Sequence, residues 1–214
     1  MGGTFDPVHC GHLRAALEVL ESCRLGALRL VPAAVPPHRA QPIATPGQRL
    51  RLLRAAVSAE ARLAVDAREL ARAGPSWTID TLRSLRSELP ATPLCLVLGA
   101  DAFLGLESWR DWRAIFTLAH LIVIPRPGVP LAPAHELAAE FAARRATTAA
   151  CLGDPAGGAI IEQPVTPLGI SASAIRALLA AGGDPRWLVP DAVRDILLEE
   201  GFYKNAAPAA NTEV

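Results

Sequence analysis

The sequence Gly-Gly-Thr-Phe-Asp-Pro-Val-His-Cys-Gly-His occupies residues 2–12 and runs directly into a segment with helical spacing of apolar residues. That spacing predicts a core-facing helix over 12–23, with a stripe of Leu13, Ala16, Leu17 and Leu20. Glycines let a backbone approach a ligand closely, and a helix start presents N–H groups and the positive end of its dipole. We therefore expect a phosphate site in which His9 and His12, three residues apart, face one anion.

Outward from this segment, runs rich in Val, Ile and Leu alternate with longer segments of helical period. This alternation is typical of β-α-β units and predicts an α/β fold with a mainly parallel sheet. We expect strands over 27–32, 63–66, 93–99, 120–125 and 159–163. Further helices are expected over 48–58, 79–89, 109–118, 135–143, 173–181 and 191–200. The helix over 48–58 carries an apolar stripe of Leu50, Leu53, Ala56 and Val57.

Composition restricts the function classes. The 214 residues carry 21 basic and 21 acidic side chains, so no net field steers the protein to nucleic acid or to a membrane surface. The four cysteines form no C-x-x-C pair, and we expect a cytoplasmic protein without a signal peptide or a membrane span. We expect one domain over 1–204, with a helical part from about 165, and a flexible tail over 205–214.

Five further blocks follow the first motif in order. The sequence resembles the H-x-G-H nucleotidylyltransferases and, among them, the bacterial nicotinate mononucleotide adenylyltransferases. The blocks that carry the resemblance are 35–39 (V-P-P-H-R), 74–78 (G-P-S-W-T), 99–101 (G-A-D), Trp109 and 170–176 (I-S-A-S-A-I-R). The resemblance implies a Rossmann-like, doubly wound sheet with a small C-terminal helical part.

The same resemblance implies transfer of the adenylyl group of ATP to nicotinate mononucleotide, with release of pyrophosphate. No protein nucleophile is needed, because the acceptor phosphate attacks the α-phosphorus in line and the protein has to hold and neutralise two polyanions. Mg²⁺ is expected to bridge the ATP phosphates through substrate and water rather than a carboxylate cage.

The site residues are carried over position by position. His9 and His12 are expected to contact the ATP phosphates and stabilise the transition state, as imidazolium ions once a phosphate is near. The other expected ATP contacts are Gly3, Thr4, Phe5, Asp101, Ser171, Ser173 and Arg176. Those expected at nicotinate mononucleotide are Thr78, Trp109, His38 and Arg39.

Each assignment has a structural alternative. Asp101 would also serve as a helix cap, Trp109 as a core aromatic, and Ser171 with Arg176 as an ordinary capped helix and a solvated cation. Nicotinamide mononucleotide or phosphopantetheine as the acceptor is the nearest alternative activity, and a nucleotide-binding module without turnover is the alternative of a different class. An aminoacyl-tRNA synthetase fragment would need a basic surface, which zero net charge disfavours.

The first residues depart from the family pattern. In the family a hydrophobic strand leads into the glycine loop at the centre of the sheet, whereas here Met1 directly precedes Gly2. A missing central strand would cost several kcal/mol, against a typical total stability of about 5–15 kcal/mol. We therefore expect that the natural protein begins a few residues upstream.

Overall fold

The computed structural model describes residues 1–36 and 41–204. Its strands form two parallel sheets. The first has the order β1-β2-β3, from β1 (Gly2–Gly3), β2 (Leu28–Pro32) and β3 (Leu63–Val65). The second has the order β4-β5-β7-β6, from β4 (Cys95–Gly99), β5 (His120–Ile124), β7 (Ile160–Glu162) and β6 (Arg145–Ala146). The predicted parallel α/β architecture is confirmed.

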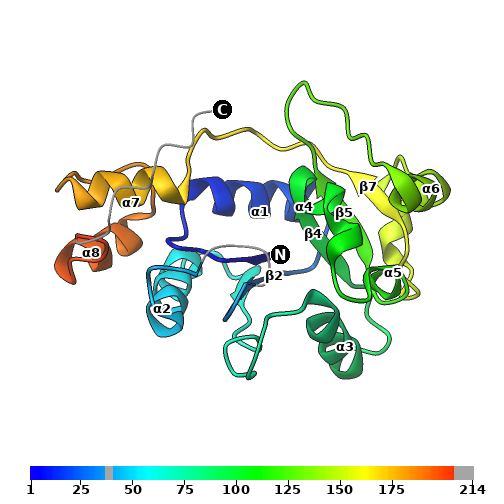
Figure 1. Cartoon of the computed structure of the whole chain (residues 1–214), viewed down its shortest axis with the longest axis horizontal. Coiled ribbons are helices and arrows are strands. Elements are labelled where there is room, and N and C mark those ends of the chain that lie inside the picture. Colours follow the sequence, from blue (N-terminus) through cyan, green and yellow to red (C-terminus); the bar gives the residue numbers. More distant parts are fainter. Residues whose placement is uncertain (37–40, 205–214) are drawn as a thin grey trace.

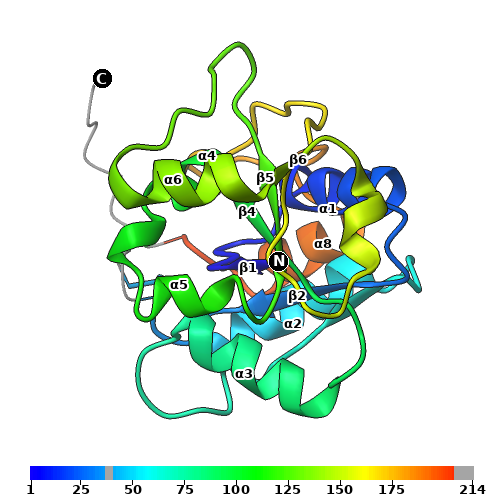
Figure 2. The ribbon, with the colours of Figure 1, turned by 90° about the vertical axis from the view of Figure 1, so that its right-hand side faces the viewer.

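Helices cover both faces of the strands. They are α1 (Cys10–Ser22), α2 (Pro46–Val57), α3 (Thr78–Glu88), α4 (Ala100–Leu104), α5 (Trp112–Ile115), α6 (His135–Arg144), α7 (Ala172–Ala180) and α8 (Asp191–Glu199), with short 3₁₀ helices η1 (Leu106–Ser108) and η2 (Ala149–Gly153). Figure 1 shows α1 on one side of the strands and α2 and α3 on the other, with α7 and α8 at one end. In Figure 2, α4 and α6 share the side of α1, and α5 lies on the side of α3. This is the doubly wound arrangement that the sequence predicted.

Two apolar clusters form the core. The first joins Leu30 of β2 to Ile122 of β5, so one cluster connects the two sheets. It also contains Ile175 of α7 and Val193 of α8, so the C-terminal helices pack on the same core as the sheet. The second cluster lies around Phe103 and includes residues of α3, α5 and α6. Each fully buried side chain of this size contributes roughly 1.5–3 kcal/mol.

A first strand is present, so the expectation that it is missing is wrong in part: the strand consists of the motif glycines Gly2 and Gly3 alone, and a start further upstream stays a prediction. Gly2 pairs with Val31 and Gly3 with Pro32, in a parallel register. The Met1 ammonium donates a hydrogen bond to the carbonyl of Arg29 at 2.8 Å. Burial lowers the pKa of that amine to about 6.

The largest difference in the helices lies at 109–118, where the prediction was one continuous helix. Only Trp112–Ile115 is α-helical, because Asp111 adopts the left-handed conformation with φ of 51° and Trp109 is extended. A residue with positive φ interrupts the hydrogen bonding of a right-handed helix. The spacing of apolar residues, from which the helix was predicted, carries no information about φ. The short elements α4, η1, β6 and η2 were also not predicted.

Helix α2 buries Leu53 and Val57 as predicted, together with Arg49 and Leu52, which were not predicted. The other two residues of the predicted stripe, Leu50 and Ala56, are only half-buried. The expected tail at 205–214, and His38 and Arg39, lie outside the described residues. No helix within 1–36 and 41–204 is both long and apolar enough to cross a membrane.

Candidate active site

The loop between β1 and α1 is built around the ring of Phe5. A Cβ atom on Gly3 would lie 2.7 Å from Phe5 Cζ, so position 3 accepts only glycine without a shift of that ring. Phe5 has a positive φ of 52° and is buried. Its ring meets the imidazole of His12 edge-on, with centroids 5.1 Å apart. Phe5 thus packs against one motif histidine, and Gly3 leaves the space that the Phe5 ring occupies.

The two motif histidines are in contact. His9 is the N-cap of α1, and its ring stacks on that of His12 with centroids 3.7 Å apart and an interplanar angle of 29°. The N–H of His9 also donates to His12 Nδ1 at 3.3 Å. A Cβ atom on Gly11 would lie 3.0 Å from His9 Nδ1. The glycine between the two histidines therefore leaves the space that this ring occupies.

Burial determines the charge of His9 in the ligand-free protein. The residue is only 7% exposed, and desolvation lowers the pKa of its imidazole to about 4. Its Nδ1 is a buried polar atom without a hydrogen-bond partner among the described residues. An unmet buried polar group is costly, and an anion that supplied a partner would be favoured there. The expected imidazolium belongs to the phosphate-bound state and stays a prediction.

The start of α7 lies against the start of α1. Ser171 caps α7 by accepting a hydrogen bond from the N–H of Ala174 at 3.1 Å, as predicted. Arg176 reaches the loop between β1 and α1, since its Nη1 donates to the carbonyl of Asp6 at 2.7 Å and its Nη2 donates to Ser173 Oγ at 3.2 Å. The structure therefore brings Ser171, Ser173 and Arg176 together with the histidine loop.

Two of the first three N–H groups of α1 are occupied within the protein. The N–H of Cys10 donates to the carbonyl of Leu188 at 2.9 Å, which fixes the segment before α8 against α1, and the N–H of His12 donates to the carbonyl of His9 at 3.0 Å. The predicted unpaired N–H groups at this helix start are therefore fewer than expected. The positive end of the helix dipole remains directed at the loop.

Asp6 connects the loop between β1 and α1 to two distant segments, a role that the sequence did not predict. Its carboxylate accepts from the N–H of Ile43 at 2.8 Å, the N–H of Ala44 at 3.0 Å and the hydroxyl of Tyr203 at 2.7 Å. Burial and the Asp6 carboxylate together raise the pKa of Tyr203. The aspartate stands in the motif, but its partners lie 37 to 197 residues away, beyond the reach of local pattern reading.

Of the residues predicted to bind nicotinate mononucleotide, Thr78 lies at the start of α3 and Trp109 lies between η1 and α5. Thr78 is the first residue of α3, and the preceding turn is fixed because Ser76 Oγ accepts a hydrogen bond from the N–H of Ala34 at 2.8 Å. Trp109 is half-buried against the second core cluster. Its neighbour Arg110 is 3.9 Å from Asp80 in the first turn of α3. The structure therefore places Thr78 and the Trp109 segment side by side.

Asp101 stands at the carboxyl end of β4, in the first turn of α4. Its side chain is 70% exposed and forms an ion pair with Arg126 at 2.6 Å. The alternative that Asp101 caps this helix is wrong, because Gly99 is the N-cap residue. Its exposed carboxylate lies where open parallel sheets bind their ligands.

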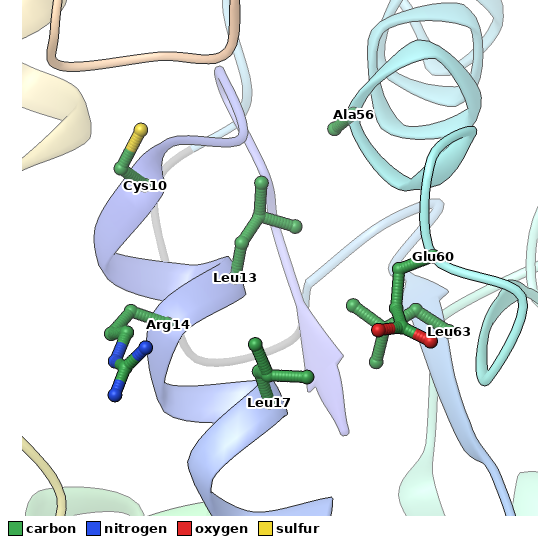
Figure 3. A pocket seen from close by; sticks show the side chains of 7 residues that line it. All are labelled: Cys10, Leu13, Arg14, Leu17, Ala56, Glu60 and Leu63. Atoms are coloured by element: carbon green, nitrogen blue, oxygen red, sulfur yellow. The ribbon is translucent and has the colours of Figure 1, made fainter.

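A separate apolar groove of about 260 Å³ lies between α1 and α2. Figure 3 shows Leu13 and Leu17 pointing from α1 toward Leu63 and Glu60, with Cys10 at one end. Such a lining does not suit two polyanions, so this groove is not the proposed substrate site. Burial raises the pKa of Cys10, which keeps it a thiol, in agreement with a passive role.

No cluster of three or more His, Cys, Asp or Glu side chains suited to a metal ion occurs in the described part of the chain. Two candidate carboxylates are already engaged, Asp6 by backbone N–H groups and Tyr203, and Asp101 by Arg126. A divalent cation at this site would have to bring most of its ligands with the substrate.

Comparisons with known proteins agree with this fold. A cytidylyltransferase-like family model matches residues 1–178. A Halorhodospira halophila protein named "probable nicotinate-nucleotide adenylyltransferase" is 51% identical over 95% of this chain and 93% of its own length. A Methylococcus capsulatus protein of the same name is 45% identical over 94% of this chain and 97% of its own length. The Plasmodium falciparum nicotinic acid mononucleotide adenylyltransferase, solved with NaAD, shares the fold with a TM-score of 0.70, 15% identity and 95% coverage of both chains.

Proposed function

This chain belongs to the cytidylyltransferase-like family, and from that premise we propose that it transfers the adenylyl group of ATP to nicotinate mononucleotide. The products are nicotinate adenine dinucleotide and pyrophosphate, and the reaction is a step of NAD synthesis. The names of the relatives support this reaction, and an acceptor change to nicotinamide mononucleotide or phosphopantetheine is not favoured by them. We place the enzyme in the cytoplasm, where its nucleotide substrates are found.

The observation that carries the site assignment is the buried, unpartnered Nδ1 of His9, stacked on His12 at a helix start. We propose that His9 and His12 contact the ATP phosphates, with Gly3, Thr4 and Phe5 forming the loop beneath them. Phosphate charge next to the ring favours the imidazolium form, so His9 takes up a proton when ATP binds. The proton then lies between ring and phosphate, where charge develops during transfer.

Arg176 and the start of α7 supply the second set of donors to ATP. Arg176 is 22% exposed, so its guanidinium can keep the Asp6 contact and still meet a phosphate at the surface of the cluster. The exposed hydroxyls of Ser171 and Ser173 lie at the same helix start. Asp101, exposed at the end of β4, is proposed to bind the ribose of a nucleotide in exchange for Arg126.

Nicotinate mononucleotide is proposed to bind between the start of α3 and the Trp109 segment. The half-buried indole of Trp109 offers a face for the pyridine ring. Thr78, in the first turn of α3, lies at the positive end of that helix and suits a carboxylate. His38 and Arg39 are proposed to contact the acceptor as well, on the sequence resemblance alone.

The chemical step is an in-line displacement. An oxygen of the acceptor phosphate forms a bond to the α-phosphorus of ATP, the bond from that phosphorus to the bridging oxygen breaks, and pyrophosphate leaves with the bond electrons. We propose Mg-ATP as the true substrate, with the cation bound mainly to phosphate oxygens and water. The protein contributes alignment and positive charge, and none of its groups becomes covalently attached.

The test of the site is a comparison of histidine variants. Pyrophosphate release with Mg-ATP and nicotinate mononucleotide is measured for the wild type, His12→Ala and His135→Ala, the last altering an exposed histidine at the start of α6. We expect His12→Ala to lose at least about 100-fold in kcat, in the range typical for loss of a transition-state donor, and His135→Ala to match the wild type. Equal rates for all three proteins would remove His12 from the site.

A further inference from the structure

Arg49 carries a charge in the core of the protein, which the site described above does not use. It lies on the inward face of α2 with Leu52 and Leu53 and is 0% exposed. Burial lowers the pKa of its guanidinium, while the nearby Asp6 carboxylate acts in the opposite direction. Arginine keeps its charge even so. A buried cation is costly to hold, so its partners indicate what it does.

Those partners are backbone carbonyls of three separate segments. Nη1 donates to Thr4 O at 2.8 Å, Nε donates to Ala44 O at 3.3 Å, and Nη2 donates to Ala34 O at 3.4 Å. Thr4 belongs to the proposed phosphate loop after β1, Ala34 follows β2, and Ala44 precedes α2. A planar guanidinium with five donors in fixed directions can hold three carbonyls at once, whereas an ammonium group cannot reproduce that geometry.

Each of the three segments is joined to another part of the site. The N–H of Ala34 donates to Ser76 Oγ, two residues before Thr78 at the proposed acceptor site. The N–H of Ala44 donates to the carboxylate of Asp6, whose carbonyl binds Arg176 at the proposed ATP site. Arg49 therefore stands at the junction between the backbone that holds ATP and the backbone that holds the acceptor.

We infer that Arg49 is a positioning residue for adenylyl transfer, which sets the phosphate loop and the acceptor segment at the separation needed for in-line attack. It touches neither substrate. This inference rests on the proposed function. A misplacement of about 1 Å far from the reacting atoms can cost on the order of 100-fold in rate, because reacting atoms have to meet at about 3–3.5 Å.

The test compares Arg49→Lys with Arg51→Lys, a matched change on the exposed side of the same helix, where Arg51 pairs with Glu200. Arg49→Lys keeps the positive charge but cannot make the three hydrogen bonds of the guanidinium to Thr4, Ala34 and Ala44. We expect kcat to fall about 10- to 100-fold in Arg49→Lys. We expect the Kd of α,β-methylene-ATP and the Kd of nicotinate mononucleotide, each measured alone, to change less than about threefold, because each half of the site remains formed. Arg51→Lys should keep the wild-type kcat.

Three results would overturn the inference: a kcat of Arg49→Lys within about twofold of the wild type, a loss of both separate affinities equal to the loss of kcat, or a kcat loss matched by the unfolded fraction in a urea titration.

A second readout separates this inference from the proposed function. Amide hydrogen exchange of the ligand-free proteins should be faster at 33–35 and 43–45 in Arg49→Lys than in Arg51→Lys, with exchange in β5 unchanged. Equal exchange rates in the two variants would show that Arg49 does not hold the segments at 33–35 and 43–45 in place. If the wild type forms no dinucleotide, the proposed function fails, and the exchange data still decide whether Arg49 holds the segments together.

Discussion

Acid sensitivity of folding is the most direct physical consequence of the buried histidine. The pKa of His9 is about 4 in the folded protein, against 6.5 for an ordinary histidine. As the pH falls below 6.5, the unfolded chain binds a proton that folded His9 does not accept until the pH approaches 4. The folded state therefore loses stability over this window, and the loss is complete only below the folded pKa.

The magnitude follows from these two values. Between pH 7 and pH 5 the difference in proton binding removes about 2 kcal/mol from the free energy of unfolding. Because His9 is only 7% exposed, solvent screening reduces this figure little. His9→Gln has no such proton equilibrium, so it should lose about 2 kcal/mol less than the wild type over the same interval.

Urea unfolding of the wild type, His9→Gln and His135→Gln at pH 7 and pH 5 measures this difference. Comparing each protein with itself at the two pH values cancels the packing cost of the substitution. His135→Gln alters an exposed ring and should follow the wild type. A His9→Gln protein that lost as much stability as the wild type would refute the assignment of a depressed pKa to His9.

Three further substitutions test contacts of the site. Gly11→Ala places a Cβ atom 3.0 Å from His9 Nδ1, and we expect kcat to fall about 10- to 100-fold in a pyrophosphate-release assay while Cys10→Ala stays near the wild type. Tyr203→Phe removes the hydroxyl that donates to Asp6 at 2.7 Å, and urea titration should show a loss of about 1–3 kcal/mol; an unchanged midpoint would show that Asp6 does not need this donor. Ser171→Ala removes the cap of α7 and should cost about 1 kcal/mol, whereas Ser171→Asp should retain stability; equal losses in both would argue against capping.

The sequence predicted those features that depend on neighbouring residues. The parallel sheet followed from apolar runs, the start of α1 from glycines before an amphipathic segment, and the cap of α7 from Ser171. Each of these signals involves only residues that are close to one another in the sequence. The proximity of His9 and His12 also follows from local spacing, because side chains three residues apart lie on one side of a helix start; the stacking of their rings was not predicted.

The features that were missed depend on distant contacts. Asp6 and Tyr203 meet across the whole chain, and spacing does not indicate such a pair. The burial of Arg49 was not predicted, although an arginine three and four residues before Leu52 and Leu53 lies on the same side of a helix as those leucines. The positive φ of Asp111 excludes the first residues of the predicted helix over 109–118. Glycine in a sequence signals such a conformation, whereas aspartate does so only weakly.

Product formation tests the central claim most directly. The purified protein is incubated with Mg-ATP and nicotinate mononucleotide, and nicotinate adenine dinucleotide and pyrophosphate are quantified together, with nicotinamide mononucleotide and phosphopantetheine as parallel acceptors. We expect the two products in equal amounts and the highest rate with nicotinate mononucleotide. Absence of the dinucleotide, or faster transfer to either other acceptor, would contradict the account.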